Sequence, residues 1–396
     1  MKYELIATST FGLEAVVKRE IEDLGYKIIK SENGKITYIG DERAIARSNI
    51  SLRCADRVLI KLGEFRAIEF EDLFQGIKGI PLEEIIPTDG SIIVTASSVK
   101  SILHSEPAIQ RITKKAIIER LKESYGIQDF NETGATYKIK VSILKNLATV
   151  TLDTTGAGLH KRGYRIRDVK APIKETLAAG LVKLSFWKDL AMLPDAILRS
   201  DDLKPRPLVD LCAGSGTILI EAAMMARNIM PGANRDFTSM NWHIIDQNIW
   251  EDEFRRAKES EYQEGTLDIQ GFDIEEKAIS VAKANAKRAG VDKDIFFHKM
   301  NMKKFTPNPK KANGIIITNP PYGERLGKEK DLMEIYKHLD KIMNIEKSWS
   351  IFFITSIRDI EKLCFSREAD RRRKLYNGRI EATYYQFHGT KRERSI

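Results

Sequence analysis

Long apolar runs, cysteine and histidine are all scarce in this sequence of 396 residues. No stretch reaches the roughly 18 uninterrupted apolar residues that a membrane span needs. The N-terminus lacks the basic head and apolar core of a signal peptide. The three cysteines are scattered and odd in number, and the six histidines show no metal-ligand spacing. These absences argue against a disulfide framework and a metal site, and they predict a cytoplasmic protein.

The composition is that of a globular protein with a basic balance. Hydrophobic residues make up 42% and charged residues 31%, which is ordinary for a soluble domain. The length predicts two or three domains. The net charge of +9 favours a polyanionic partner. Charge alone does not identify that partner, because many basic proteins bind no nucleic acid.

The first part of the chain predicts two α+β units. Residues 1–66 show the order strand, helix, strand, strand, helix, strand, which is that of a ferredoxin-like unit. Asn33-Gly34 is a two-residue hairpin turn within it. Residues 67–155 are expected to form a second unit, with a long helix from Glu106 to Tyr125 and a closing hairpin around Lys145-Asn146.

Two basic features lie in or after the second unit. Arg111, Lys114 and Lys115 share one face of the long helix. A solvated surface is one interpretation of this face, and contact with phosphates is the other. Residues 156–170, which include a run of cations from His160 to Arg167, are interpreted as a basic connector.

Strands and helices alternate over residues 171–390. This alternation predicts an α/β domain with a mainly parallel sheet and helices on both faces. Near the end, two strand-like runs joined by Asn377-Gly378 predict an antiparallel hairpin. Residues 230–265, which contain Trp242 and Trp250, are interpreted as an insertion on this sheet.

A strand, a glycine turn and a helix follow one another around Asp210. Gly214 and Gly216 let a ligand approach the backbone, and the helix N-terminus adds unpaired N–H groups. A dinucleotide fingerprint needs a third glycine where Leu219 stands. The acid at Asp210 suits a cationic ligand, and S-adenosylmethionine carries an ammonium and a sulfonium. Asp273 ends the next strand, where a carboxylate can bind ribose hydroxyls or cap a helix.

The sharpest motif is Asn319-Pro320-Pro321-Tyr322, which follows an apolar strand. Ligands bind at the carboxyl ends of such strands. The prolines fix the backbone and remove its donors, so the Asn319 side-chain oxygen and the Pro320 carbonyl remain as acceptors for an NH₂ group. Tyr322 offers an aromatic face to a base. Methyl transfer from a sulfonium needs alignment more than a metal or a strong base.

The order of these motifs resembles that of class I methyltransferases that act on amino groups, through residues 210–216, Asp273 and residues 319–322. Residues 160–165 and 171–179 resemble a narrower group with a ferredoxin-like unit and a THUMP domain. Within that group the chain is most similar to the RlmL-like family, over nearly its whole length.

This resemblance implies a ferredoxin-like domain at 1–66, a THUMP domain at 67–155 and a Rossmann-like class I domain at 171–390 with an antiparallel C-terminal hairpin. It implies N2-methylation of guanine in 23S ribosomal RNA, recognition of structured RNA, and a segment at 172–179 that covers the cofactor. Related THUMP enzymes methylate transfer RNA. The residues expected to bind S-adenosylmethionine are Asp210, Ala213, Gly214, Gly216, Asp273, Ile274, Asn301, Met302 and Asn319, and the expected catalytic residues are Asn319, Pro320 and Tyr322.

Several alternatives stay open. Asn301 stands where amino-methylating relatives often place an Asp near the adenine amine, although its amide oxygen can also accept. The Asn-Pro-Pro-Tyr pocket serves adenine-N6 methylation in DNA and glutamine methylation in proteins as well. DNA methylases usually carry a target-recognition insert. The extra residues of this chain are N-terminal and resemble a THUMP domain, which favours RNA over DNA as the substrate. An intact motif argues against a non-catalytic RNA-binding factor, and a thiolation enzyme would need a nucleotide-activating loop and working cysteines.

Overall fold

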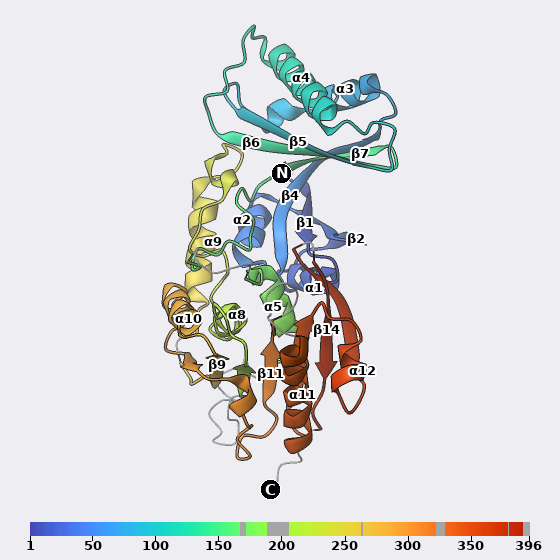
Figure 1. Cartoon of the computed structure of the whole chain (residues 1–396). Coiled ribbons are helices and arrows are strands. Elements are labelled where there is room, and N and C mark those ends of the chain that lie inside the picture. Colours follow the sequence, from blue (N-terminus) through green and yellow to red (C-terminus); the bar gives the residue numbers. More distant parts are fainter. Residues whose placement is uncertain (167–171, 188–205, 263, 322–328, 379, 391–396) are drawn as a thin grey trace. The chain divides into compact units, whose positions relative to one another are not determined.

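The computed structural model describes residues 1–166, 172–187, 206–262, 264–321, 329–378 and 380–390 (Figure 1). The chain divides into two compact units. The N-terminal unit comprises Met1–Ser9, Val17–Leu159 and Arg235–Arg256, and the C-terminal unit comprises Thr10–Val16, His160–Asn234 and Ala257–Ile396. No described helix is both long and apolar enough to cross a bilayer.

The N-terminal unit is built on one seven-stranded sheet in the order β2-β3-β1-β4-β7-β6-β5. Its first half has the predicted ferredoxin-like order, and its second half contains the predicted long helix and closing hairpin. The elements are β1 (Tyr3–Ser9), α1 (Glu14–Asp23), β2 (Ile28–Glu32), β3 (Lys35–Gly40), α2 (Glu42–Ser51), β4 (Ala55–Arg66), α3 (Phe70–Lys78), η1 (Leu82–Glu84), β5 (Ser91–Val99), α4 (Glu106–Tyr125), β6 (Thr136–Leu144) and β7 (Leu147–Asp153).

Strand β4 joins the two predicted units into this single sheet. Its first part pairs with β1, where Ile60 faces Leu5. Its second part pairs with β7, where Phe65 faces Ala148. A register shift near Gly63 lies within the β7 pairing, and such bulges bend and twist a strand. One strand of 12 residues therefore serves both halves.

Residues 235–256 pack with the N-terminal sheet, not with the parallel sheet for which they were expected. Trp242 stacks on Tyr137 of β6 with ring centroids 5.1 Å apart, and its Nε1 donates to the Thr136 carbonyl at 3.0 Å. Trp250 stacks on Phe237 of the same segment. Both tryptophans are almost fully buried. The difference arises because the apolar surface that Trp242 needs lies on β6, far away in the sequence.

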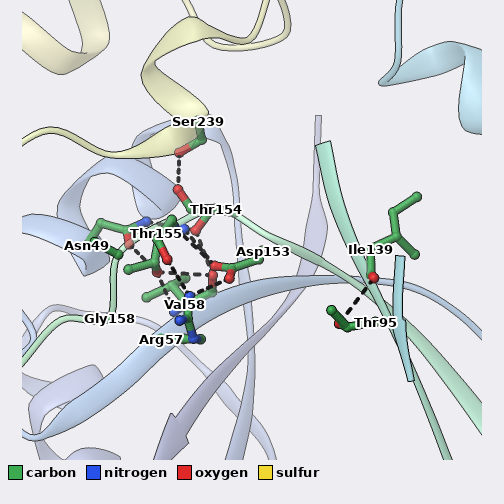
Figure 2. A network of polar contacts seen from close by, with 12 residues as sticks. Asn49, Arg57, Val58, Thr95, Ile139, Asp153, Thr154, Thr155, Gly158 and Ser239 are labelled. Carbon is green, nitrogen blue, oxygen red and sulfur yellow. Dashed lines mark hydrogen bonds and ion pairs between the residues drawn. The ribbon is translucent and has the colours of Figure 1, made fainter. Parts of the chain in front are cut away.

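A buried polar network holds this segment in place (Figure 2). The Ser239 hydroxyl donates to the Thr154 carbonyl at 2.8 Å. The Thr154 hydroxyl donates to the Val58 carbonyl of β4 and accepts from the Asn49 amide of α2. The Thr155 hydroxyl donates to the Asn49 oxygen. Because each group is buried, removing one side chain leaves its hydrogen-bond partner unsatisfied. Each such loss lowers the free energy of unfolding by roughly 1–3 kcal/mol.

Glu253 adds an ionic tie within the same unit. It lies on α9 (Gln247–Glu259), and its side chain is 1% exposed. Burial disfavours its charge, but hydrogen bonds from Arg47, Arg43 and Arg256 outweigh that effect and lower its pKa to about 2. A buried carboxylate is tolerated only with such partners, so the insertion and α2 share one charge cluster.

The C-terminal unit contains a second seven-stranded sheet in the order β10-β9-β8-β11-β12-β14-β13. The first five strands are parallel and the last two form the predicted antiparallel hairpin. The elements are α5 (Glu175–Leu184), β8 (Leu208–Asp210), α8 (Thr217–Ala226), β9 (Ile269–Asp273), α10 (Glu276–Arg288), β10 (Ile295–Lys299), η3 (Met302–Lys304), β11 (Ile315–Thr318), α11 (Glu329–Ile345), β12 (Ser350–Thr355), α12 (Ile360–Cys364), β13 (Arg371–Asn377) and β14 (Ile380–Phe387); η2 (Thr238–Asn241) lies in the insertion.

Helices cover both faces of this sheet, as the alternation predicted. Helices α8 and α10 pack against β8, β9 and β10. On the other face, α11 places Tyr336, Leu339 and Ile342 in a core with Val209 and Ile316. The carboxyl ends of the parallel strands are therefore held by a rigid frame, and the sequence motifs lie at these ends.

Candidate functional site

The two sequence motifs meet at the centre of the parallel sheet. Strands β8 and β11 are neighbours, with Val209 opposite Ile316. The strand order reverses between them, and such switch points are where open α/β sheets bind ligands. The Thr318 hydroxyl at the end of β11 donates to Asp210 Oδ1 at the end of β8, at 2.7 Å. Asn319 follows directly, so the predicted cofactor end and the predicted chemistry end are adjacent.

Asp210 is an acid with an unusual environment. Its side chain is buried, and this burial raises its pKa to about 7, with Asp273 acting in the same direction. Hydrogen bonds from Thr318 and from the Cys212 N–H, at 3.0 Å, favour the ionised form but do not cancel the effect of burial. Within the described residues no Lys or Arg pairs with it. A cationic ligand would supply the missing positive charge.

The two glycines of the turn have different roles. Both adopt left-handed backbone, with φ of 51° at Gly214 and 79° at Gly216. A Cβ on Gly216 would lie 2.9 Å from the Phe297 ring, so close packing demands glycine there. A Cβ on Gly214 would meet nothing within 4 Å. The open side of the turn is therefore at Gly214, where a ligand could reach the backbone.

Asp273 holds the glycine turn from the end of β9. Its Oδ2 accepts from the Gly214 N–H at 2.8 Å and its Oδ1 from the Glu275 N–H at 3.0 Å. The N-cap of α10 is Glu275, so the interpretation of Asp273 as the cap is wrong. Each carboxylate oxygen keeps a second acceptor position, and ribose binding stays a prediction. Ile274 follows with its side chain 61% exposed.

Asn301, Met302 and Ala213, which were predicted to bind the cofactor, also make contacts within the protein. Asn301 caps η3, because its Oδ1 accepts from the Lys303 N–H at 3.0 Å. Met302 is buried in the core, with its sulfur 3.7 Å from that of Cys212. Ala213 donates its N–H to the Phe272 carbonyl. A packing role is thus evident for Met302, and contact of these residues with the cofactor stays a prediction.

Asn319 carries the clearest sign of a missing partner. Its Oδ1 is buried and has no hydrogen-bond partner among the described residues. An unsatisfied buried acceptor costs roughly 1–3 kcal/mol and is expected where a ligand supplies the donor. Pro320 is buried beside it and has no N–H to offer. Tyr322, the third predicted catalytic residue, lies outside the described residues.

Sequence reasoning missed Asn285 of α10. Its side chain is 1% exposed. Its Nδ2 donates to the Ser215 carbonyl in the glycine turn at 3.0 Å, and its Oδ1 accepts from the Ile166 N–H at 3.0 Å. One amide thus joins the turn to the connector. A signal was available, because Asn285 lies on the same helix face as the buried Ile279 and Ala282.

Two cations of the connector, Arg162 and Arg165, face inward. Arg165 donates to Glu175 of α5 at 2.7 Å and to the Thr217 hydroxyl at the start of α8 at 3.1 Å. Arg162 is buried and pairs with Glu221 of α8 at 3.4 Å. These two arginines therefore stabilise the C-terminal unit through internal ion pairs and hydrogen bonds. From the sequence alone they are interpreted only as part of a basic connector.

Comparison with known proteins assigns the family. The sequence profile of an RMKL-like methyltransferase domain matches residues 162–386. The chain belongs to the RMKL-like methyltransferase family. Profiles of the RlmL ferredoxin-like domain and of the THUMP domain match residues 4–59 and 67–153. The switch-point site therefore lies in the methyltransferase part of this RMKL-like chain, after the two N-terminal domains.

Relatives of this RMKL-like chain match over nearly its whole length. YpsC of Bacillus subtilis (strain 168), for which RNA methyltransferase activity is itself a proposal, is 44% identical, and the alignment covers 98% of this chain and 96% of YpsC. SMU.472, a proposed methyltransferase crystallised with SAH, is 40% identical with a TM-score of 0.90, covering 99% of both chains. A predicted N6-adenine-specific DNA methylase from Listeria monocytogenes str. 4b F2365 is 40% identical with a TM-score of 0.89, covering 98% and 97%.

Proposed function

We propose that this protein transfers a methyl group from S-adenosyl-L-methionine to an exocyclic amine of an RNA base, guanine N2 of 23S ribosomal RNA. The observation that carries the proposal is the buried Asn319 Oδ1, which has no hydrogen-bond partner in the part of the chain that the structure describes. It lies directly after Thr318, which contacts Asp210. A site for an amine donor therefore adjoins a buried acid that favours a cation.

The described residues fit S-adenosylmethionine. When bound, this group supplies an electrophilic methyl on a sulfonium. Asp210 would favour its positive charge, the open side of Gly214 would admit it to the backbone, and Asp273 would accept from its ribose. The SAH complex of the related SMU.472 supports the same choice of cofactor.

The chain's own contribution to the reaction is alignment. Asn319 Oδ1 and the Pro320 carbonyl would accept the two N–H groups of the target amine and point its lone pair at the methyl group. The nitrogen would form a bond to the methyl carbon while the bond between that carbon and sulfur breaks, with S-adenosylhomocysteine as the neutral leaving group. The nitrogen would then lose one proton to solvent. Tyr322 is proposed to stack on the base.

RNA as the substrate rests on the N-terminal unit. Its THUMP and RlmL ferredoxin-like profiles are those of RNA-modifying enzymes in the resemblance described above. The net charge of +9 and the proposed RNA activity of YpsC point in the same direction. Guanine N2 and the 23S target come from the RlmL-like resemblance.

Nucleoside mass spectrometry of RNA and DNA from a deletion strain tests the substrate. We expect N2-methylguanosine to disappear from the 23S ribosomal RNA fraction and to return on complementation. Loss confined to transfer RNA would move the target within the class of guanine-N2 enzymes. Loss of N6-methyladenine from DNA with unchanged RNA, as the name of the Listeria relative suggests, would overturn the proposal.

Asn319→Ala tests the amine site. Because this change removes one of two acceptors that align the amine, we expect the methylation rate to fall by roughly 10²–10³-fold. Calorimetry should give a Kd for SAH within about twofold of the wild type, because Asp210, Gly214 and Asp273 are proposed to supply the main contacts with the cofactor. A variant that keeps full activity would show that the amine does not bind at Asn319.

A further inference from the structure

Strand β10, at one edge of the parallel sheet, exposes a pair of aromatic rings. Phe296 is 61% exposed and His298 is also exposed. Their ring centroids are 3.8 Å apart, with an angle of 66° between the ring planes. Ile295 and Phe297, which point to the other face of the same strand, are buried. The alternation shows that the exposed pair occupies a whole face of the strand.

The pair is uncovered because the helix on that face does not extend over it. The α11 side chains pack with Val209, Ile316 and Phe272 of the three inner strands, and no β10 residue belongs to that core cluster. His298 lies beside Phe272 with ring centroids 6.2 Å apart. Among the described residues β10 pairs with β9 alone. Contiguous exposed apolar surface that is rimmed by polar residues marks binding sites, so the charges beside this ring pair matter for its interpretation.

The charge of the adjoining segment defines the kind of partner. From Ile295 to Lys311 the sequence has five lysines and no acidic residue. Three of the lysines form ion pairs with glutamate or aspartate side chains. Lys304 and Lys310 are exposed and have no acidic partner within the described residues. Phe305 packs on Phe272 with centroids 5.6 Å apart, which brings this lysine segment to the face that carries His298.

We infer that this edge binds single-stranded RNA, with Phe296 and His298 stacking on unpaired bases and Lys304 and Lys310 contacting phosphates. Stacking needs bases that are not already paired, and the phosphates need mobile cations nearby. The inference rests on the proposed RNA substrate and adds a second contact surface to it. Strand β10 runs toward Asn301, so a strand bound there would flank the proposed cofactor site.

Fluorescence anisotropy with the full chain tests the surface, using a labelled short oligouridylate and an RNA duplex of the same length. Phe296→Ala should weaken oligouridylate binding by roughly 5- to 150-fold, since one stacked base contributes about 1–3 kcal/mol. Phe296→Tyr should restore it. Lys304→Gln and Lys310→Gln should each reduce the salt slope by about 0.7.

Ile380→Ala is the matched control, because Ile380 is exposed on β14 at the other side of the sheet. It should leave binding unchanged, and all variants should keep the SAH affinity of the wild type. Unchanged oligouridylate binding by Phe296→Ala would overturn the inference. Equal losses of binding in Phe296→Ala and in the control Ile380→Ala would overturn it as well. If deletion strains lack N2-methylguanosine in 23S RNA while Phe296→Ala binds normally, the surface assignment fails and the proposed function stands.

Discussion

A single buried carboxyl, Asp210, sets the charge at the centre of the site. In the ligand-free protein its raised pKa makes the proton compete with a cationic ligand. Thr318 contributes a hydroxyl that favours the ionised form. The sequence showed the acid and its position at a strand end. It did not show the pKa, because burial and the Thr318 contact depend on a strand far along the chain.

The pH dependence of ligand binding follows from this shift. Below about pH 7 Asp210 is protonated, so a ligand that needs the carboxylate must first displace a proton. We expect the Kd for S-adenosylmethionine to be about tenfold larger at pH 6 than at pH 8. Isothermal titration calorimetry at several pH values measures it. Asp210→Asn should bind weakly with a flat pH profile, and a wild-type Kd independent of pH would contradict the assignment.

At the scale of elements, α10 positions the glycine turn. Asn285 contacts the Ser215 carbonyl on one side and the Ile166 N–H on the other. The glycine turn, the Asn33-Gly34 turn, the C-terminal hairpin and the strand ends follow from local sequence rules, and each was predicted. Asn377 differs, because it pairs with Ile380 at the end of β13 and does not lie in the turn. The Asn285 bridge could not be, because its two partners come from segments distant in the sequence and only folding brings them together.

Asn285→Ala tests this positioning role. It removes the side-chain partner of the buried Ser215 carbonyl and of the part-buried Ile166 N–H, so we expect the free energy of unfolding to fall by roughly 1–3 kcal/mol. The displaced turn should raise the Kd for SAH by about tenfold, although Asn285 is not proposed to touch the cofactor. Denaturation and calorimetry measure the two effects. Lys283 is exposed on the same helix, so Lys283→Ala should change neither stability nor SAH affinity. If Asn285→Ala bound SAH as tightly as the wild type, Asn285 would not position the turn for the cofactor.

At the scale of the whole molecule, the chain passes between the two units at five points. The N-terminal unit contains Arg235–Arg256, which lie in sequence within the methyltransferase part. The sequence predicted this segment as an insertion but assigned it to the wrong sheet, because local patterns do not say which distant surface a tryptophan will cover. Profile boundaries at 153 and 162 therefore do not mark a separable fragment.

Truncation tests this view. A fragment of residues 1–159 lacks Trp242, which covers Tyr137, and Glu253, which pairs with Arg47. We expect it to unfold at lower temperature than the N-terminal unit of the full chain, or to aggregate. Joining residues 235–256 through a flexible linker should restore stability. In the full chain Trp242→Ala should cost roughly 3–5 kcal/mol, as measured by denaturation, and a fragment as stable without the segment would refute the prediction.

The same segment has a consequence for how the protein is made. The ribosome completes Leu159 long before Arg256, and the 96 residues between them take about 5–20 s to synthesise at ordinary translation rates. During this interval the nascent N-terminal unit has its sheet but no cover over Tyr137. The order of synthesis thus leaves an apolar face open to chaperones until the middle of the methyltransferase part has emerged.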